Sequence, residues 1–298
     1  MELGRLLTAM VTPFDSEGKV DYALAKRLAG ALLDSGSEGV VLAGTTGESP
    51  TLTHEEKIRL FTEVRDEIGG RGAIVAGTGT YNTAESIELT RAATDAGADA
   101  VLLTTPYYSK PPQEGIYRHF EAIAASTRLP VIIYNIPGRT AVNVTAETQL
   151  RLAEIPNIAG VKESSGDLVQ IAEIIAKAPP SYRVWSGDDQ LTLPILSLGG
   201  YGIISVCSHL VGLQMRGMIE AHLAGEVASA AELHRRLLPL MTTLMTAAPN
   251  PIAVKHALSK CGFPAGAVRL PLVEPDEAAS QLITAELARQ HIDLAVAV

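Results

Sequence analysis

Residues 131–139 read VIIYNIPGR, and residues 158–165 read IAGVKESS. Each stretch begins with a nearly uninterrupted run of apolar residues and then changes to polar and reactive side chains. Such continuous apolar runs are typical of strands that are buried on both faces, as in a parallel sheet. In a parallel barrel the residues that follow each run lie at the carboxyl end, where the loops build the active site.

Six further runs of the same kind occur along the chain, with helical patterns between them. The eight predicted strands cover residues 6–12, 39–43, 73–76, 100–104, 131–134, 158–162, 184–186 and 202–206. The predicted helices between strands cover residues 21–35, 53–68, 83–96, 145–153 and 168–177. Thr53 and Glu56 form a capping-box pattern, Thr83 is read as a helix start, and Gly97 as a helix end. The alternation favours an α/β fold, a (β/α)8 TIM barrel, with a doubly wound open sheet as the alternative.

After the last predicted strand the pattern changes to helices alone. They cover residues 225–246, 251–260 and 276–290. We therefore predict a catalytic barrel over residues 1–225 and a C-terminal helical domain over residues 226–298, a three-helix appendage that packs on the barrel or on a neighbouring subunit.

Composition narrows the class of protein. The chain has 298 residues, 47% of them hydrophobic, and a formal net charge of −9. This excludes disorder as the main state and argues against nucleic acid or an anionic membrane as partner, since both need a basic surface. Cys207 and Cys261 are too few for a disulfide framework or a cysteine zinc site. With no signal-peptide pattern and no run of roughly 18 apolar residues, we expect a cytoplasmic protein.

Lys162 has the most informative position. It directly follows the apolar run 158–161, so we expect it at the mouth of a dry barrel. Desolvation disfavours the ammonium form and lowers the pKa of a lysine from about 10.4 towards neutrality. A neutral amine condenses with a ketone or aldehyde to form a Schiff base. The alternatives are a lysine that extends into solvent or one that pairs with Glu163.

Neighbouring strand ends carry groups that suit small anionic substrates. Tyr134 ends the adjacent strand, and its hydroxyl is expected to reach the Lys162 amine and shuttle protons, unless it is simply a core tyrosine. Thr45 and Thr46 stand between glycines, in a turn that either holds a small carboxylate or is an ordinary turn. Arg139 either grips a second carboxylate bidentately or forms a surface ion pair.

Tyr107 and Tyr108 precede a proline-rich loop, and because adjacent tyrosines are common at interfaces, one of them is expected to serve a partner subunit.

Other catalytic chemistries are poorly supported by the sequence. The turn at Thr45 lacks the lysine of a phosphate-binding loop, and Ser186 lacks the G-x-S-x-G elbow. No Cys/His set has the spacing of metal ligands, so no metal site is predicted.

Together these motifs closely resemble the 4-hydroxy-tetrahydrodipicolinate synthase family, long called the dihydrodipicolinate synthases. The matching segments are residues 44–48 (GTTGE), 106–111 (PYYSKP), 134–140 (YNIPGRT), 160–163 (GVKE), 186–189 (SGDD), 202–205 (GIIS) and 250–255 (NPIAVK). The resemblance covers essentially the whole chain. The loop and the lysine are shared by the wider pyruvate-dependent aldolase superfamily, which includes the N-acetylneuraminate lyases, whereas Arg139 favours the lysine-pathway enzymes.

The resemblance implies a lyase of lysine (diaminopimelate) biosynthesis. Lys162 would form a Schiff base with pyruvate, and the resulting enamine would attack the aldehyde of L-aspartate-4-semialdehyde before the product cyclises by transimination. No metal or organic cofactor is expected, because the enamine itself is the carbon nucleophile. The usual assembly is a homotetramer, a dimer of tight dimers.

The resemblance also implies roles for single residues. The proton-relay triad matches Tyr134, Thr45 and Tyr108. Tyr108 would reach across a subunit interface, Thr46 would hold the pyruvate carboxylate, and Arg139 would bind the semialdehyde carboxylate. Gly187 and the backbone of Ile204 would line the pocket.

Some members of the family are inhibited by L-lysine at the tight-dimer interface. The matching positions here include Ser49, Leu52, His54, Tyr81, Glu85 and Tyr107. Tyr81 stands where an asparagine is usual in strongly inhibited members, and Lys57 stands where a second histidine is. A cation at Lys57 would repel the ammonium groups of the ligand, so we expect weak or absent inhibition by lysine.

Two other functions stay open from the sequence alone. A sister aldolase or lyase acting on a 2-keto-3-deoxy sugar acid would keep Lys162 and Tyr134 but would need hydroxyl-binding groups in place of Arg139. A non-enzymatic binding or regulatory barrel would keep the pocket without a reactive amine.

Overall fold

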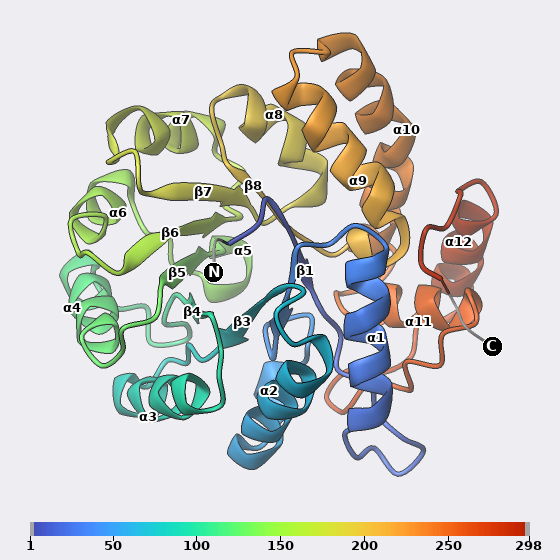
Figure 1. Cartoon of the computed structure of the whole chain (residues 1–298), viewed down its shortest axis with the longest axis horizontal. Helices are drawn as coiled ribbons and strands as arrows, with labels where there is room; N and C mark the ends of the chain where they lie inside the picture. The colour runs from blue at the N-terminus through green and yellow to red at the C-terminus, as the bar shows by residue number, and fades with distance from the viewer. Residues whose placement is uncertain (1–2, 296–298) are drawn as a thin grey trace.

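The eight predicted strands form one closed barrel. The computed structural model describes residues 3–295, and within them each strand pairs in parallel with the strands before and after it (Figure 1). The strands are β1 (Leu6–Ala9), β2 (Gly39–Leu42), β3 (Ala73–Gly77), β4 (Ala100–Thr104), β5 (Val131–Asn135), β6 (Ile158–Glu163), β7 (Arg183–Ser186) and β8 (Gly202–Ser205). Because β1 also pairs with β8, the TIM-barrel prediction is confirmed and the open-sheet alternative is wrong.

Helices surround the barrel (Figure 1). The longer ones are α1 (Tyr22–Asp34), α2 (His54–Ile68), α3 (Thr83–Asp95), α4 (Gln113–Ala124), α6 (Ala146–Leu152), α7 (Leu168–Lys177), α8 (Thr192–Ser197) and α9 (Ser208–Leu223). The loops after β2, β5 and β7 hold short turns: η1 (Ser49–Thr51), α5 (Pro137–Thr140) and η2 (Asp189–Leu191). The sequence patterns missed three of these helices: α4, which has Pro112 at its start and no capping side chain, the six-residue α8, and α9, whose backbone is kinked at Val211.

Helix ends follow local capping chemistry. The capping box at Thr53 and Glu56 is present, and Gly97 has a φ of 82°, as expected of a glycine just past a helix end. The prediction that a helix opens at Thr83 is confirmed, since Thr83 is the first residue of α3. Asn82 caps α3, because its side-chain oxygen accepts from the N–H groups of Ala84 and Glu85.

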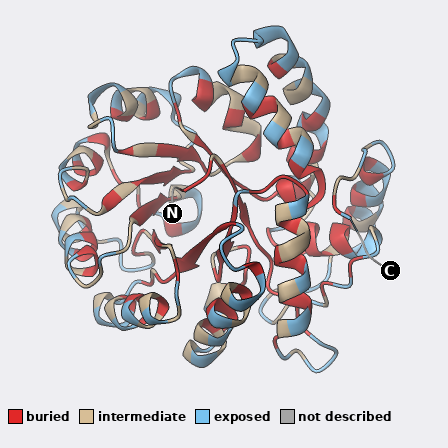
Figure 2. Cartoon of the chain, viewed as in Figure 1, coloured by how far each residue is buried: buried red, intermediate tan, exposed pale blue. Residues whose placement is uncertain are grey.

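Adjacent residues of a strand face two different cores. Leu7 and Ile204 belong to a cluster inside the barrel, whereas Leu6 and Ile203 pack in the layer between strands and helices. Both faces of the strands are therefore buried (Figure 2). Trp185 helps to fill the interior, and its indole N–H donates to the carbonyl of Gly4 at 3.0 Å. The apolar side chains inside the barrel exclude water beneath the polar groups at the carboxyl ends of the strands.

Three helices follow the barrel with no strand between them: α10 (Val227–Thr246), α11 (Ile252–Lys260) and α12 (Glu277–Leu287). They lie together on one side of the barrel, next to α9 (Figure 1). The three-helix appendage is thus confirmed, while the division at residues 225 and 226 stays a prediction. No helix in residues 3–295 has the length and apolar character needed to cross a membrane.

Candidate active site

Lys162 and Tyr134 lie side by side at the carboxyl end of the barrel. They are register partners on β6 and β5, and the Lys162 Nζ lies 4.2 Å from the centroid of the Tyr134 ring. Lys162 is only 5% exposed, so it does not extend into bulk solvent. Glu163 is not its partner, since that carboxylate accepts from Asn135 Nδ2 at 3.0 Å and from Gln149 Nε2 at 2.8 Å. Both alternatives that the sequence left open for Lys162 are therefore wrong.

The environment of Lys162 favours the neutral amine. Burial lowers its pKa to about 8, against the opposing effect of the Asp188 and Asp189 carboxylates. At pH 7 an amine with this pKa is neutral in about one molecule in ten, compared with roughly one in 3,000 at its ordinary pKa of 10.5. The amine can therefore act as a nucleophile near neutral pH.

The Tyr134 phenol stays protonated. Burial raises its pKa, and Asp188 adds to the effect, while Arg139 and the Thr45 hydroxyl lower the pKa by less. A protonated phenol can donate a proton and, if a neighbouring hydroxyl passes one on, accept another.

Gly187 shapes the space around the Lys162 side chain. A Cβ atom at Gly187 would lie 2.0 Å from Ser164 Oγ and 3.1 Å from both Cε and Cγ of Lys162. Only a glycine fits this position without moving the lysine. Ile204, the other predicted pocket residue, is fully buried in the core inside the barrel.

The loop after β2 carries Thr45 and Thr46 and is anchored by the C-terminal part of the chain. Thr46 is 2% exposed, and its Oγ1 accepts from Asn250 Nδ2 at 2.9 Å. Glu48, in the left-handed conformation with a φ of 57°, forms a fully buried ion pair with Lys255 at 2.8 Å.

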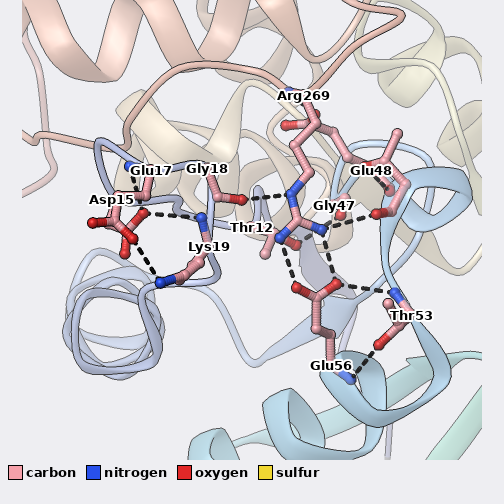
Figure 3. A network of polar contacts seen from close by, with 11 residues as sticks. Thr12, Asp15, Glu17, Gly18, Lys19, Gly47, Glu48, Thr53, Glu56 and Arg269 are labelled. Carbon is pink, nitrogen blue, oxygen red and sulfur yellow. Dashed lines mark hydrogen bonds and ion pairs between the residues drawn. The ribbon is translucent and has the colours of Figure 1, made fainter.

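Arg269 adds a second anchor to this loop (Figure 3). Its backbone N–H donates to Glu48 Oε2 at 2.9 Å, and its guanidinium donates to both carboxylate oxygens of Glu56, at 2.8 and 2.6 Å, and to the Gly18 carbonyl at 2.7 Å. On the other side of the loop, Thr12 Oγ1 donates to the Gly47 carbonyl at 2.7 Å. These contacts fix the loop before any ligand binds.

Arg139 lies in the short turn α5 and is exposed at the same end of the barrel. Its Nη2 donates to the Asn250 carbonyl at 3.3 Å, and its charge lowers the pKa values of Lys162 and Tyr134. The surface ion pair that the sequence left open is not formed within residues 3–295, and the guanidinium keeps donors for an anionic ligand.

Tyr108 is the one predicted relay residue that the fold does not bring to Lys162. It is 93% exposed and has a φ of 70°. Tyr107, in contrast, is half-buried, with its ring edge-to-face against Tyr81 at 5.1 Å between centroids. A positive φ is unfavourable for a residue with a bulky side chain. The backbone of Tyr108 is therefore strained while its aromatic ring remains in solvent.

A cavity of about 430 Å³ adjoins the site. Its lining includes Thr45 and most of the positions matched to lysine inhibition, namely Ser49, Leu52, Tyr81, Glu85 and Tyr107. His54 is not among the lining residues. Lys57 does line the cavity; burial lowers the pKa of Lys57, and the nearby Glu85 carboxylate raises it.

Three residues of this site received no functional role from the sequence. Burial raises the pKa of Asp188 to about 6, and the charges of Asp188 and Lys162 interact: each favours the charged form of the other. Ser164 Oγ is buried with no hydrogen-bond partner among the described residues, and Asn250 joins two predicted binding residues. Position after a strand signals the first two, but nothing local signals Asn250. Residues 3–295 contain no group of three or more His, Cys, Asp or Glu residues that could hold a metal ion.

Comparisons with known proteins agree with this geometry. The sequence matches the dihydrodipicolinate synthetase family over residues 2–290. The 4-hydroxy-tetrahydrodipicolinate synthase of Moorella thermoacetica is 56% identical over 287 residues, which cover 96% of this chain and 98% of the relative. The crystal structure of a dihydrodipicolinate synthase from Bacillus anthracis is 46% identical with a TM-score of 0.94, covering 97% of this chain and 98% of that one. The dihydrodipicolinate synthase of Cyanidioschyzon merolae, solved with lysine bound, is 44% identical with a TM-score of 0.95, covering 96% and 98%. The chain therefore belongs to the dihydrodipicolinate synthetase family.

Proposed function

We propose that this chain condenses pyruvate with L-aspartate-4-semialdehyde through a Schiff base on Lys162. Membership of the family makes the chain a lyase of lysine biosynthesis through diaminopimelate, with the 4-hydroxy-tetrahydrodipicolinate synthase reaction as its activity. The observation that carries the role of Lys162 is the placement of its amine, 5% exposed and 4.2 Å from the Tyr134 ring, with a pKa of about 8.

The reaction begins with the neutral amine. Lys162 Nζ attacks the ketone carbon of pyruvate, and water leaves to give a protonated imine. Loss of a proton from the methyl group gives an enamine, whose carbon adds to the aldehyde of the second substrate. The amino group of that substrate then attacks the imine carbon and releases Lys162 as the ring closes. The imine is the electron sink that makes the carbon nucleophile.

Proton transfers in these steps are assigned to Tyr134 and Thr45, with Tyr108 supplied by a second copy of the chain. The high pKa of Tyr134 and the nearby Thr45 hydroxyl support a relay rather than a stable phenolate. The exposure of Tyr108 in a left-handed conformation supports a role outside its own subunit. We accordingly propose a homotetramer built from tight dimers, in which each site is completed by its neighbour.

Two anionic substrates need fixed donors inside a protein of net negative charge. We assign the pyruvate carboxylate to Thr46 and the semialdehyde carboxylate to Arg139, with Gly187 and Ile204 lining the space around the imine. The positions support this division, because Thr46 is buried at the barrel mouth whereas Arg139 is exposed at its entrance.

The cavity beside Thr45 is the proposed effector site, and Ser49, Tyr81, Glu85 and Tyr107 line it. His54 does not line the cavity, and we propose that it contributes to the site from outside this lining. The Lys57 side chain lines this cavity, and in its protonated form it would repel the ammonium groups of a lysine ligand. We therefore propose weak or absent inhibition by L-lysine. We also propose a cytoplasmic location, in keeping with the two free thiols of Cys207 and Cys261.

A coupled assay tests the proposed function. The purified protein is given pyruvate with L-aspartate-4-semialdehyde, and in parallel 2-keto-3-deoxy sugar acids are offered for cleavage. Turnover of the semialdehyde alone supports the proposal, whereas preferred cleavage of a sugar acid would replace it with the sister aldolase activity. The absence of any borohydride-trapped pyruvate adduct would point to a non-enzymatic barrel instead.

A further inference from the structure

Asn250 connects the C-terminal helices to the mouth of the barrel. It lies in the connection between α10 and α11, and it is 7% exposed. Its Nδ2 donates to Thr46 Oγ1 at 2.9 Å across 204 positions of sequence, and its carbonyl accepts from Arg139 Nη2 at 3.3 Å. One residue outside the barrel strands therefore contacts both groups assigned to substrate carboxylates.

The contact with Thr46 decides where the threonine proton can go. A hydroxyl has one proton to donate and two lone pairs that accept. Because the Asn250 amide occupies a lone pair of Thr46 Oγ1, the Thr46 proton is left for another acceptor. A carboxylate bound beside Lys162 would be a suitable acceptor for this proton. A hydrogen bond to an ionised acceptor is stronger than one to a neutral group.

We propose that Asn250 is a positioning residue, whose side chain orients the Thr46 hydroxyl toward the carboxylate of pyruvate and whose backbone carbonyl holds Arg139 for the second substrate. This inference rests on the proposed function. It predicts an asymmetry, because a side-chain substitution removes the contact with Thr46 but keeps the carbonyl that binds Arg139. Loss of the Asn250 side chain should therefore weaken pyruvate binding and leave semialdehyde binding nearly unchanged.

Other contacts keep the loop in place when Asn250 is replaced. Glu48 stays paired with Lys255 at 2.8 Å and bonded to the backbone N–H of Arg269 at 2.9 Å. Asn250→Ala should therefore fold and leave a correctly placed loop with an undirected hydroxyl. Asn250→Asp is the sharper change, because a carboxylate only accepts hydrogen bonds and would take the Thr46 proton for itself. It would also repel the pyruvate carboxylate.

The experiment measures the pyruvate concentration that half-saturates borohydride trapping, together with the KM for L-aspartate-4-semialdehyde, in the full-length protein. Asn250→Ala should raise the first value about tenfold, which corresponds to about 1.4 kcal/mol, and change the second less than twofold. Asn250→Asp should raise the first value further. Thr46→Val should match Asn250→Ala, and the double variant should be no worse than Thr46→Val alone, because the two residues act as one unit.

Asn157→Ala is the matched control. Asn157 directly precedes β6, at the end of the barrel opposite to the site. Its side chain donates to the carbonyls of Ala124 and Thr127. It should leave the pyruvate value unchanged. An unchanged value in Asn250→Ala, an equal rise in Asn157→Ala, or a further tenfold rise in the double variant would overturn the inference. Failure of the wild-type protein to trap pyruvate at all would instead overturn the proposed function.

Discussion

Replacing Gly187 with alanine should disable Lys162 without removing it. The added Cβ would lie 2.0 Å from Ser164 Oγ, which is 1.4 Å short of the 3.4 Å of an ordinary contact, and 3.1 Å from Lys162 Cε and Cγ. Ser164 can rotate its hydroxyl away, but the lysine is packed between the new methyl group and the Tyr134 ring. We expect the amine to be displaced by several tenths of an ångström.

Displacements of this size are costly in catalysis. A misplacement of about 1 Å in a reacting group can slow a reaction roughly 100-fold. We therefore expect imine formation with pyruvate to slow by about 10- to 100-fold in Gly187→Ala. Removing the tightest contact in the double variant Gly187→Ala/Ser164→Ala should restore part of the rate, because the methyl group can then settle away from Lys162.

The assay is the rate of borohydride-trapped adduct at saturating pyruvate, with thermal unfolding as a check on folding. Gly30→Ala is the matched control, since its Cβ would meet nothing within 4 Å and its position in α1 is far from the site. A wild-type trapping rate in Gly187→Ala would refute the claim that packing around this glycine positions the amine.

Three further outcomes follow from the charges of the described residues. Imine formation should rise with pH and reach half its maximum near pH 8, because Lys162 is protonated and unreactive below its pKa; Asp188→Asn should move this midpoint to lower pH, and a midpoint above 10 would contradict the buried amine. Lys255→Met should lower the free energy of unfolding in denaturant by about 3–5 kcal/mol by leaving Glu48 buried without its partner, whereas a loss under about 1 kcal/mol would show that the pair does not anchor the loop. An activity titration with L-lysine should show no half-inhibition below about 1 mM, because a protonated Lys57 repels the ammonium groups of the ligand, and half-inhibition at a lower concentration would refute this expectation.

The barrel was predictable because its strands are buried on both faces. Continuous apolar runs mark such strands, and all eight were located to within a few residues. The errors arose where local signals are weak. The first strand ends at Ala9 rather than at residue 12, because the Val11 N–H donates to the His209 side chain instead of a neighbouring strand, and α4 has no capping side chain to mark its start.

The candidate site was predictable where chemistry follows a strand directly. Lys162, Tyr134 and Gly187 all stand at or just after strand ends, so parallel pairing brings them together. Asn250 could not be found in this way, because its contact with Thr46 spans 204 positions and depends on how the C-terminal helices pack. The local pattern at residues 107 and 108 did not separate the two tyrosines, because only the fold decides that Tyr107 is half-buried and that Tyr108 is 93% exposed.

Borohydride reduction in the presence of pyruvate, followed by mass spectrometry of the proteolysed protein, tests the central claim most directly. We expect a single pyruvate-derived adduct, located on the peptide that contains Lys162, and no adduct in Lys162→Ala. An adduct on another lysine, or full turnover by Lys162→Ala, would contradict it.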